Sequence, residues 1–350
     1  AEGSFVGSMT DEQLLQRVGE ETRVLKIELR CFFNAAANPA LVREKYLIER
    51  QITTSTFSNV FLCSNVHTRK QYVLKRIKPD KTYFDQSLLE VAVLFYLKKK
   101  GPSARHRFLE IVECFQFEGC LHIITEVLGN SLYDEFIKPR RPAAMAEAQA
   151  VLRDVLLCLR FLKEQGIIHC DIKPENVLLK GGLAQGVRVI DFGSATFAND
   201  VDFDYVQTRP YRAPEVVLGC AFDFAVDMWS LGCLAYELVT CRVLFNSKTM
   251  QENLAKAMAV SRFFALEPFA QNARRAPRPF VHGNVVACGT GPELRVLVPR
   301  NDYDLAADLQ THGCDELLVE FIRGCLAMDP AQRLRVEDAL AHPFLRKSFA

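Results

Sequence analysis

The stretch of sequence that decides the fold is IHCDIKPENVLL, at residues 168–179, and a second short run, VIDFG, follows at residues 189–193. The carboxylate of Asp171 can orient a hydroxyl and accept its proton, and Lys173 can offset negative charge beside it. Asn176 and Asp191, fifteen residues apart, offer hard oxygen ligands of the kind that Mg²⁺ prefers. These residue types predict a site where an anion and a metal ion lie next to a reacting hydroxyl.

Transfer of a phosphoryl group needs a carboxylate beside the attacking hydroxyl, metal ligands and a cation. The two runs resemble the catalytic-loop and D-F-G motifs of the protein kinase family. The resemblance implies that ATP and Mg²⁺ are the cofactors, that Asp171 and Lys173 are catalytic, and that Asn176 and Asp191 hold the metal. It covers residues 46–344 of the chain.

Other parts of the family pattern occur in the same order along the chain. Lys75 lies in a β-forming run where the family keeps its phosphate-binding lysine, and Glu90 follows fifteen residues later, so the resemblance implies an ion pair between them. The resemblance implies that Glu215 and Arg333 form a structural ion pair inside the large lobe. His169 is expected to organise the catalytic loop, and Asp227 to be architectural.

The order of predicted elements indicates an α+β fold with two lobes, which is the bilobal protein kinase fold. Residues 46–52, 59–63 and 71–77 read as strands, 84–99 as a helix, and 108–117 and 121–127 as further strands of a small antiparallel sheet. Beyond residue 129 the pattern is mainly helical, with helices predicted at 143–165, 226–238, 315–328 and 336–342.

The chain is therefore predicted to have four parts. Residues 1–8 look like a cloning remnant, and residues 9–45 form an extension whose segment 10–30 has helical spacing. Residues 46–127 form the small lobe, and residues 128–350 form the hinge and the large lobe. Within the large lobe, residues from about 266 to 314 read as an insertion with weak regular structure, because they are rich in Pro, Gly and Arg.

The segment YVQTRPYRAPE, at residues 205–215, resembles the CMGC group of kinases, which includes MAP kinases and cyclin-dependent kinases. The KPEN run and Thr208 are typical of serine/threonine kinases. Cys170 stands where most kinases have arginine, and together with Tyr205 it is similar to the dual-specificity tyrosine-regulated (DYRK) kinases. That resemblance implies autophosphorylation of Tyr205, and Arg209 and Arg212 are the predicted partners of its phosphate.

The phosphate-covering loop departs from the family. The family has G-x-G-x-x-G, and here Thr53, Ser55 and Ser58 stand at the three glycine positions. Side chains there should make closure over ATP more costly. The resemblance assigns the ATP site to Ile52, Thr53, Ser55, Ser58, Val60, Val73, Lys75, Thr125, Glu126, Leu128, Asn176, Leu178 and Asp191. The resemblance also implies that Thr125 lies at the back of the adenine pocket and that residues 126–128 form the hinge.

Two functions are consistent with this pattern: an active serine/threonine kinase, or a pseudokinase scaffold with weak nucleotide binding. The intact Lys75, Glu90, Asp171, Asn176 and Asp191 favour the active enzyme. The net charge of +1 argues against nucleic acid and membrane partners, and the sequence has no long apolar run. We expect a monomer that acts on protein substrates in the cytoplasm or nucleus, with its 12 scattered cysteines reduced.

Overall fold

The computed structural model describes residues 41–198, 206–261 and 303–349, and three short strands between residues 280 and 297. The chain divides into two compact units. Ala1–Gly129 and Arg188–Ala195 form the first, which we call the sheet unit; Asn130–Val187 and Thr196–Ala350 form the second, the helical unit. The predicted boundary after residue 127 lies close to this division, but the prediction missed that the D-F-G segment belongs to the sheet unit. The helix predicted at 10–30 lies outside the described residues.

The sheet unit contains a six-stranded antiparallel sheet in the order β1-β2-β3-β4-β6-β5. Its strands are β1 (Leu41–Val42), β2 (Tyr46–Thr54), β3 (Ser58–Asn65), β4 (Gln71–Ile77), β5 (Ile111–Phe117) and β6 (Cys120–Thr125). The strands predicted from runs rich in β-forming residues are confirmed. Lys75 pairs with Val60 on one side and with Ile123 on the other, so it lies on a central strand.

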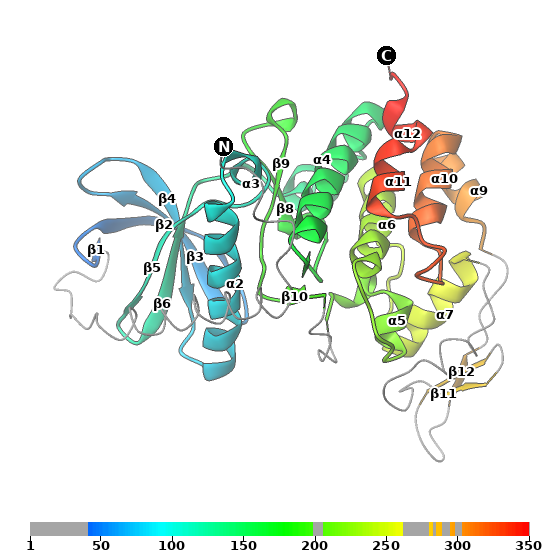
Figure 1. The fold of residues 1–350 in the computed structure, drawn as a ribbon, viewed down its shortest axis with the longest axis horizontal. Coiled ribbons are helices and arrows are strands. Elements are labelled where there is room, and N and C mark those ends of the chain that lie inside the picture. Colours follow the sequence, from blue (N-terminus) through cyan, green and yellow to red (C-terminus); the bar gives the residue numbers. More distant parts are fainter. Residues whose placement is uncertain are drawn as a thin grey trace, which may run out of the picture. The chain divides into compact units, whose positions relative to one another are not determined.

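The two faces of this sheet are covered differently. One face buries a cluster formed by Val42, Tyr46, Cys63, Leu74, Phe115, Phe117 and Ile124. Successive side chains of a strand point to opposite faces, so Lys75 lies on the face opposite to Leu74. Helix α2 (Lys81–Lys99) lies along that opposite face and brings Glu90 to Lys75 (Figure 1).

Helix α2 begins three residues earlier than the sequence predicted. Asp80 caps it, because its carboxylate accepts hydrogen bonds from the backbone N–H groups of Thr82 and Tyr83. The short helix α3 (Pro102–Arg105) follows. Val189 lies later in the chain; its carbonyl accepts a bond from the backbone N–H of Leu109, and its own N–H donates to the carbonyl of Arg107. These two bonds attach the D-F-G segment to the sheet unit.

The helical unit is built around α6, in which every residue after Ala225 is buried. Gly232 is needed in this helix, since a Cβ there would lie 2.8 Å from the Cβ of Cys325. The helices are α4 (Met145–Glu164), α5 (Pro214–Val217), α6 (Ala225–Thr240), α7 (Met250–Ser261), α9 (Leu305–Thr311), α10 (Glu316–Cys325), α11 (Val336–Ala341) and α12 (Pro343–Arg346). The four predicted long helices are confirmed, and α7 was not predicted.

Short elements connect these helices. They are the π-helix η1 (Tyr133–Ile137), the 3-10 turns η2 (Pro174–Asn176), η3 (Leu183–Gln185) and η4 (Arg209–Tyr211), and the strands β7 (Ile167–Ile168), β8 (Val177–Leu179), β9 (Val187–Val189) and β10 (Thr196–Phe197). None of the helices in the described residues is both long and apolar enough to cross a membrane.

The insertion before residue 315 contains more regular structure than its composition predicted. A three-stranded antiparallel sheet is formed by β11 (Phe280–His282), β12 (Val285–Cys288) and β13 (Arg295–Leu297). Helix α9 follows, and Asp304 caps its first turn. The sequence did not indicate these strands, because they are only three or four residues long and give little periodic signal.

Candidate active site

The catalytic loop of the helical unit starts from a buried pair of strands. Ile168 on β7 pairs with Thr196 on β10, and the loop leaves β7 directly afterwards. Both carboxylate oxygens of the buried Asp227, on α6, accept backbone N–H groups, one from His169 and one from Cys170. The architectural role predicted for Asp227 is confirmed.

Cys170 adopts a left-handed backbone conformation, with φ of 62°, which is uncommon for a residue other than glycine. Its side chain is fully buried, and burial raises the pKa of its thiol well above the usual value. The thiol is therefore protonated at neutral pH. His169 accepts a hydrogen bond from the backbone N–H of Asp171 through Nδ1, at 3.2 Å, as its predicted organising role requires.

Asp171 is the most fully bonded carboxylate of this loop. Its Oδ1 accepts hydrogen bonds from the backbone N–H and the hydroxyl of Thr208, at 3.0 and 2.7 Å. Its Oδ2 accepts bonds from Lys173 Nζ, at 2.6 Å, and from Asn176 Nδ2, at 3.0 Å. The structure thus brings together three of the predicted catalytic and metal-binding residues with the predicted substrate-segment threonine.

The protonation state of Asp171 follows from these contacts. Burial by itself raises the pKa of the carboxyl group. The charge of Lys173 and the hydrogen bonds from Lys173 and Thr208 outweigh burial, so the pKa of Asp171 is lowered overall. The group is a carboxylate at neutral pH, as a proton acceptor must be.

Asn176 is oriented as a metal ligand needs to be. Its Nδ2 group donates to the backbone carbonyl and to the carboxylate of Asp171, at 2.9 and 3.0 Å. With the amide nitrogen fixed in this way, the amide oxygen is left to accept a cation. This donor set fits Mg²⁺, which prefers carboxylate and carbonyl oxygens.

The substrate segment is held by a second left-handed residue, Gln207, whose φ is 66°. Its buried amide nitrogen donates to the carbonyl oxygens of Tyr211 and Val226 and to the hydroxyl of Ser230. Its backbone carbonyl accepts two bonds from the guanidinium of Arg212. This network fixes the backbone directly before Thr208.

The two arginines predicted to receive a phosphate on Tyr205 lie in different surroundings. Arg212 is 2% exposed and donates to the carbonyl oxygens of Val206 and Gln207, so it braces the segment. Arg209 is partly exposed and donates through Nη1 to the carbonyl of Lys248, at 2.9 Å. Arg209 has no carboxylate partner among the residues that the structure describes. Tyr205 lies outside those residues, so the phosphate contact stays a prediction.

A buried carboxylate that the sequence analysis missed lies behind this segment. Glu237, on α6, is 2% exposed and accepts a hydrogen bond from the hydroxyl of Tyr211. Burial raises the pKa of Glu237 to about 7, the nearby Glu175 adds to the increase, and the bond from Tyr211 opposes it. The only signal in the sequence is an acidic residue within an apolar helix.

The ion pair predicted between Glu215 and Arg333 is confirmed. The two side chains are 1% and 0% exposed and form two parallel bonds, of 2.6 and 2.9 Å. Arg333 also donates to the carbonyls of Ala225, Ala327 and Met328. The pair fixes the end of the substrate segment to the body of the helical unit.

In the sheet unit, Lys75 and Glu90 form the predicted ion pair, with Nζ 2.7 Å from Oε2. Burial lowers the pKa of Lys75, but the carboxylates of Glu90 and Asp191 outweigh it and leave that pKa raised. The lysine is therefore a fixed cation. Asp191, which belongs to the same unit, is the predicted second metal ligand.

The D-F-G segment has its own anchors within the sheet unit. Asp191 is a third left-handed residue, with φ of 65°, and its Oδ1 accepts the backbone N–H of Gly193 at 3.4 Å. The ring of Phe192 packs edge-on against Phe108, with 5.8 Å between ring centres. Backbone strain of this kind is common at functional sites, where the surrounding contacts maintain it.

The glycine-free loop is a tight hairpin between β2 and β3. Ser55 and Ser58 bond to each other through backbone and side-chain atoms, so two of the three substituted positions form one contact. The third, Thr53, is exposed on β2 and pairs with Val60. Paired strands therefore continue on both sides of the loop without glycine, with register shifts in β2 between Ile48 and Arg50 and between Gln51 and Thr53.

The residues assigned to adenine binding come from both units. In the sheet unit, Thr125 is 5% exposed and ends β6, while Ile52 is 45% exposed. Val60, Val73, Glu126 and Leu128 are partly exposed or exposed members of that unit. Leu178 lies on β8 of the helical unit and is partly buried. The backbone N–H of Glu110 donates to Glu126 Oε1, at 2.9 Å, which fixes the first hinge residue.

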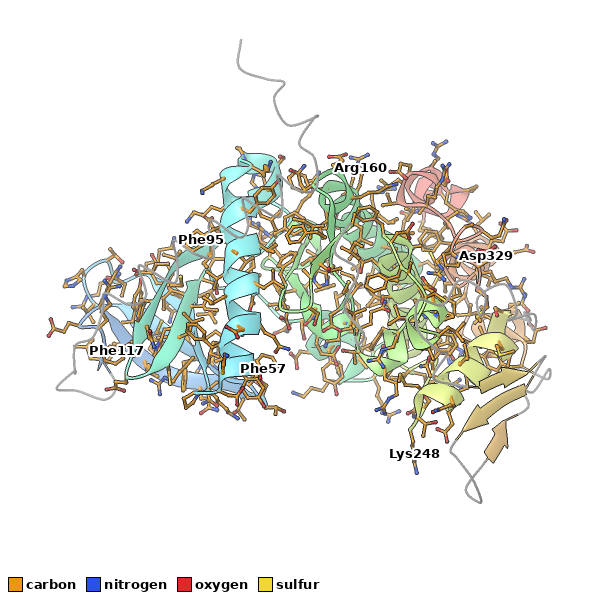
Figure 2. The ribbon with its side chains drawn as sticks, turned by 60° about the horizontal axis from the view of Figure 1, so that its bottom comes forward. Phe57, Phe95, Phe117, Arg160, Lys248 and Asp329 are labelled. Carbon is orange, nitrogen blue, oxygen red and sulfur yellow. The ribbon has the colours of Figure 1, made fainter. Side chains whose placement is uncertain are left out.

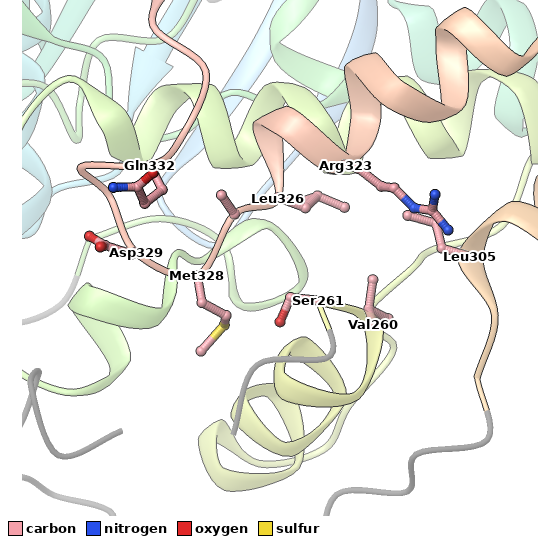
Figure 3. A pocket seen from close by; sticks show the side chains of 9 residues that line it. Val260, Ser261, Leu305, Arg323, Leu326, Met328, Asp329 and Gln332 are labelled. Carbon is pink, nitrogen blue, oxygen red and sulfur yellow. The ribbon is translucent and has the colours of Figure 1, made fainter. Parts of the chain in front are cut away.

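A cavity of about 450 Å³ lies in the helical unit between α7, α9 and α10 (Figure 3). Val260, Ser261, Leu305, Arg323 and Met328 are among the residues that line it. None of the predicted site residues belongs to it. This cavity is separate from the catalytic loop, and we assign it no part in the reaction.

The chain was compared with known families and curated proteins. Residues 46–345 match the family model described as "Protein kinase domain". Dual specificity tyrosine-phosphorylation-regulated kinase 2 of Drosophila melanogaster is 33% identical over 308 residues, which cover 87% of this chain and 42% of that protein. The human dual specificity tyrosine-phosphorylation-regulated kinase 4 is 33% identical over 308 residues, which cover 87% of this chain and 58% of that protein.

A fission yeast relative, the DYRK-family kinase pom1 of Schizosaccharomyces pombe, is 30% identical over 312 residues, or 86% of this chain and 27% of that protein. This chain thus spans between 27% and 58% of the length of the three relatives. The resemblance that the motifs carried is confirmed: the chain belongs to the protein kinase family, and these relatives are its DYRK-type, CMGC-group members.

Proposed function

We propose that this chain is an ATP-dependent protein serine/threonine kinase of the DYRK type, which activates itself by phosphorylating Tyr205. The observation that carries the proposal is the bonding of Asp171. Its carboxylate is ionised, and a threonine hydroxyl already donates to it at 2.7 Å. A substrate hydroxyl that took the same position would have its proton acceptor within hydrogen-bond reach.

Lys173 supports a serine or threonine acceptor. Its ammonium lies 2.6 Å from Asp171 Oδ2 and 2.9 Å from the hydroxyl oxygen of Thr208. A cation at this position stabilises negative charge that develops on an attacking hydroxyl oxygen and on the transferred group. Because Asp171 and Lys173 are held by Asn176 and Thr208, this chemistry needs little reorganisation of the loop.

ATP and Mg²⁺ fit the donors that the two units offer. Asn176 and Asp191 would hold the metal ion, which neutralises charge on the phosphates. Lys75, kept charged by Glu90 and Asp191, would contact the phosphates from the sheet unit. The chain's own residues position the nucleotide, orient the hydroxyl and accept its proton.

Activation through Tyr205 is supported by the arginine that follows it. A phosphotyrosine needs cationic partners. Arg209 has a guanidinium that forms no ion pair with any described carboxylate, whereas Arg212 is occupied by backbone carbonyls. We therefore assign the phosphate to Arg209 and the bracing of the segment to Arg212.

The alternative is a pseudokinase scaffold, and the loop at 53–58 favours it. All three glycine positions of that loop carry side chains, which makes close approach to phosphates more costly. Against this alternative stand Lys75, Asp171, Asn176 and Asp191, which contact the phosphates, the hydroxyl or the metal in a kinase, and Glu90, which holds Lys75.

Phosphosite mass spectrometry on the full chain expressed in bacteria, beside an Asp191→Asn variant, tests the proposal. We expect phosphate on Tyr205 in the wild-type chain and none in the variant. An Arg209→Met variant should carry less phosphate on Tyr205, or should transfer less phosphate to substrates once Tyr205 is phosphorylated. Arg209→Lys should retain part of the Tyr205 phosphate and part of that transfer activity.

Two results would contradict the proposal in different ways. Phosphate on other residues but not on Tyr205 would retain the kinase and reject this activation route. Absence of phosphate anywhere in the wild-type chain would favour the scaffold.

A further inference from the structure

The tip of the β2–β3 hairpin is closed by the two serines that replace glycines. The backbone N–H of Ser55 donates to the carbonyl of Ser58 at 2.8 Å, and the N–H of Ser58 donates to Ser55 Oγ at 3.1 Å. The two hydroxyl oxygens are 3.2 Å apart. Ser58 is only 2% exposed. A flexible glycine loop has here become a hairpin that satisfies its own polar groups.

Lys78, which follows β4, attaches this tip to the sheet. Its Nζ donates to the carbonyl of Ser55 at 2.6 Å, and its backbone N–H donates to the carbonyl of Phe57 at 2.9 Å. Ser55 and Phe57 are therefore both fixed to Lys78, just past the end of β4. The position of the Phe57 side chain follows from this fixed backbone.

The ring of Phe57 lies on the ammonium group of Lys75. Lys75 Nζ is 5.4 Å from the centre of the ring, which is within cation–π range. On another side the ring meets Tyr83 in the first turn of α2, with 6.4 Å between ring centres and an angle of 61°. Figure 2 shows Phe57 beside one end of α2. The Lys75 side chain, also paired with Glu90, is left 17% exposed.

We propose that the serine-closed hairpin holds Phe57 on Lys75, so that the ring competes with the phosphates of ATP for this ammonium group. The inference rests on the proposed function, in which Lys75 contacts those phosphates. The ammonium has three donor directions; Glu90 takes one, and the Phe57 ring covers part of what remains. The ring therefore leaves a phosphate less of the ammonium to bind, and Phe57 acts as a positioning residue that lowers the affinity for nucleotide.

The same hairpin provides a matched control. Phe61, on β3, lies over the guanidinium of Arg76, with 5.3 Å between the Arg76 Cζ atom and the ring centre. The geometry is that of Phe57 on Lys75, but Arg76 has no place in the proposed reaction. Phe57→Leu and Phe61→Leu remove the same kind of contact, and Phe57→Tyr retains a ring at the tip.

The first measurement needs no nucleotide. The full-length variants are treated briefly with acetic anhydride, and acetylation of Lys75 is measured by mass spectrometry relative to that of Lys98. We expect Phe57→Leu to raise the rate at Lys75 by about 2- to 5-fold, as loss of a partly exposed cation–π contact allows. Phe57→Tyr and Phe61→Leu should leave the rate within 2-fold of wild type.

The second measurement is the Kd of MgATP for the same variants, by calorimetry. We expect Phe57→Leu to bind about 2- to 5-fold more tightly than wild type, and Phe57→Tyr and Phe61→Leu to match wild type. An unchanged acetylation rate, or an equal or weaker affinity in Phe57→Leu, would overturn the inference and leave the proposed kinase standing. Faster acetylation with no ATP binding by any variant would overturn both.

Discussion

The two groups of residues that serve the proposed reaction are held in different ways. In the helical unit, both carboxylate oxygens of Asp171 accept hydrogen bonds, from Lys173, Asn176 and Thr208, and the loop is anchored on the buried Asp227. In the sheet unit, Lys75 and Glu90 keep their ion pair, but the hairpin next to them has replaced its glycines by a serine contact. The first group follows the family pattern and the second departs from it.

The difference separates two kinds of requirement. Residues that exchange protons, bind metal or carry charge have no substitute among other side chains, and they are all present here. Glycines provide only backbone freedom, and a pair of short hydroxyl side chains can provide a defined turn in their place. The structure therefore predicts a change in nucleotide affinity at the hairpin and little change in the chemistry at Asp171.

The largest effect should come from the buried anchor of the helical unit. Replacing Arg333 by Met leaves Glu215 charged and unpaired at 1% exposure, and we expect the free energy of unfolding to fall by about 3–5 kcal/mol. Chemical denaturation of the full chain measures it. As a control, Arg335→Met removes an exposed pair with Asp338 and should change the free energy of unfolding far less. Equal losses of unfolding free energy in Arg333→Met and Arg335→Met would show that the buried pair stabilises the fold no more than an exposed pair does.

The charge on Lys75 provides the next test. Lys75→Met should lower the rate of phosphate transfer by about 100-fold or more, because a fixed cation on the phosphates is lost. Lys98→Met removes another lysine of the sheet unit, one that donates to the carbonyl of Ile111, and should retain activity within about 2-fold. If Lys75→Met transferred phosphate at the wild-type rate, Lys75 would not be the residue that contacts the phosphates of ATP.

The buried Glu237 predicts a pH dependence of stability. Its pKa is about 7 in the folded chain and near 4.5 when unfolded, so between these values the folded state holds a proton that the unfolded state has lost. Stability should therefore fall as pH rises from about 4.5 to 7, by on the order of 2–3 kcal/mol. Denaturation of wild type and Glu237→Gln at pH 5 and pH 7.5 measures this. Parallel pH profiles in the two proteins would contradict the assignment.

The smallest effect concerns the hairpin. A Ser55→Gly, Ser58→Gly double variant should lose about 1–2 kcal/mol of stability, because two side-chain contacts disappear and backbone freedom increases. It should also bind MgATP about 2- to 5-fold more tightly, since Phe57 is released. Thr56→Gly changes an exposed residue of the same loop and is the control. Weaker ATP binding in the double variant would mean that the serines themselves contact the nucleotide.

Much of the fold could be predicted because its elements have strong local patterns. The strands at 46–54, 58–65 and 71–77 are rich in β-forming residues, and α4 and α6 have long apolar faces. The start of α2 was predicted three residues late, although Asp80 is a standard capping residue. Strands β11 to β13 were missed because segments of three or four residues have no resolvable period.

The site was predictable where a motif specifies chemistry and unpredictable where distant residues meet. Lys75 with Glu90, and Glu215 with Arg333, were inferred from the family pattern and are confirmed. The bond between Tyr211 and Glu237 joins residues 26 positions apart, and no spacing rule indicates it. The left-handed conformation of Gln207 is likewise a consequence of tertiary contacts, because its amide needs Tyr211, Val226 and Ser230 to hold it.

The most direct test of the central claim is the transfer of radiolabelled phosphate from ATP to casein by the wild-type chain and by Asp171→Asn. The account predicts measurable transfer by the wild type, a loss of about 100-fold or more in the variant, and a Kd for MgATP within 2-fold in both. Equal transfer by the two proteins would mean that Asp171 is not the proton acceptor. ATP binding without transfer by the wild type would contradict the claim that this chain is an active kinase.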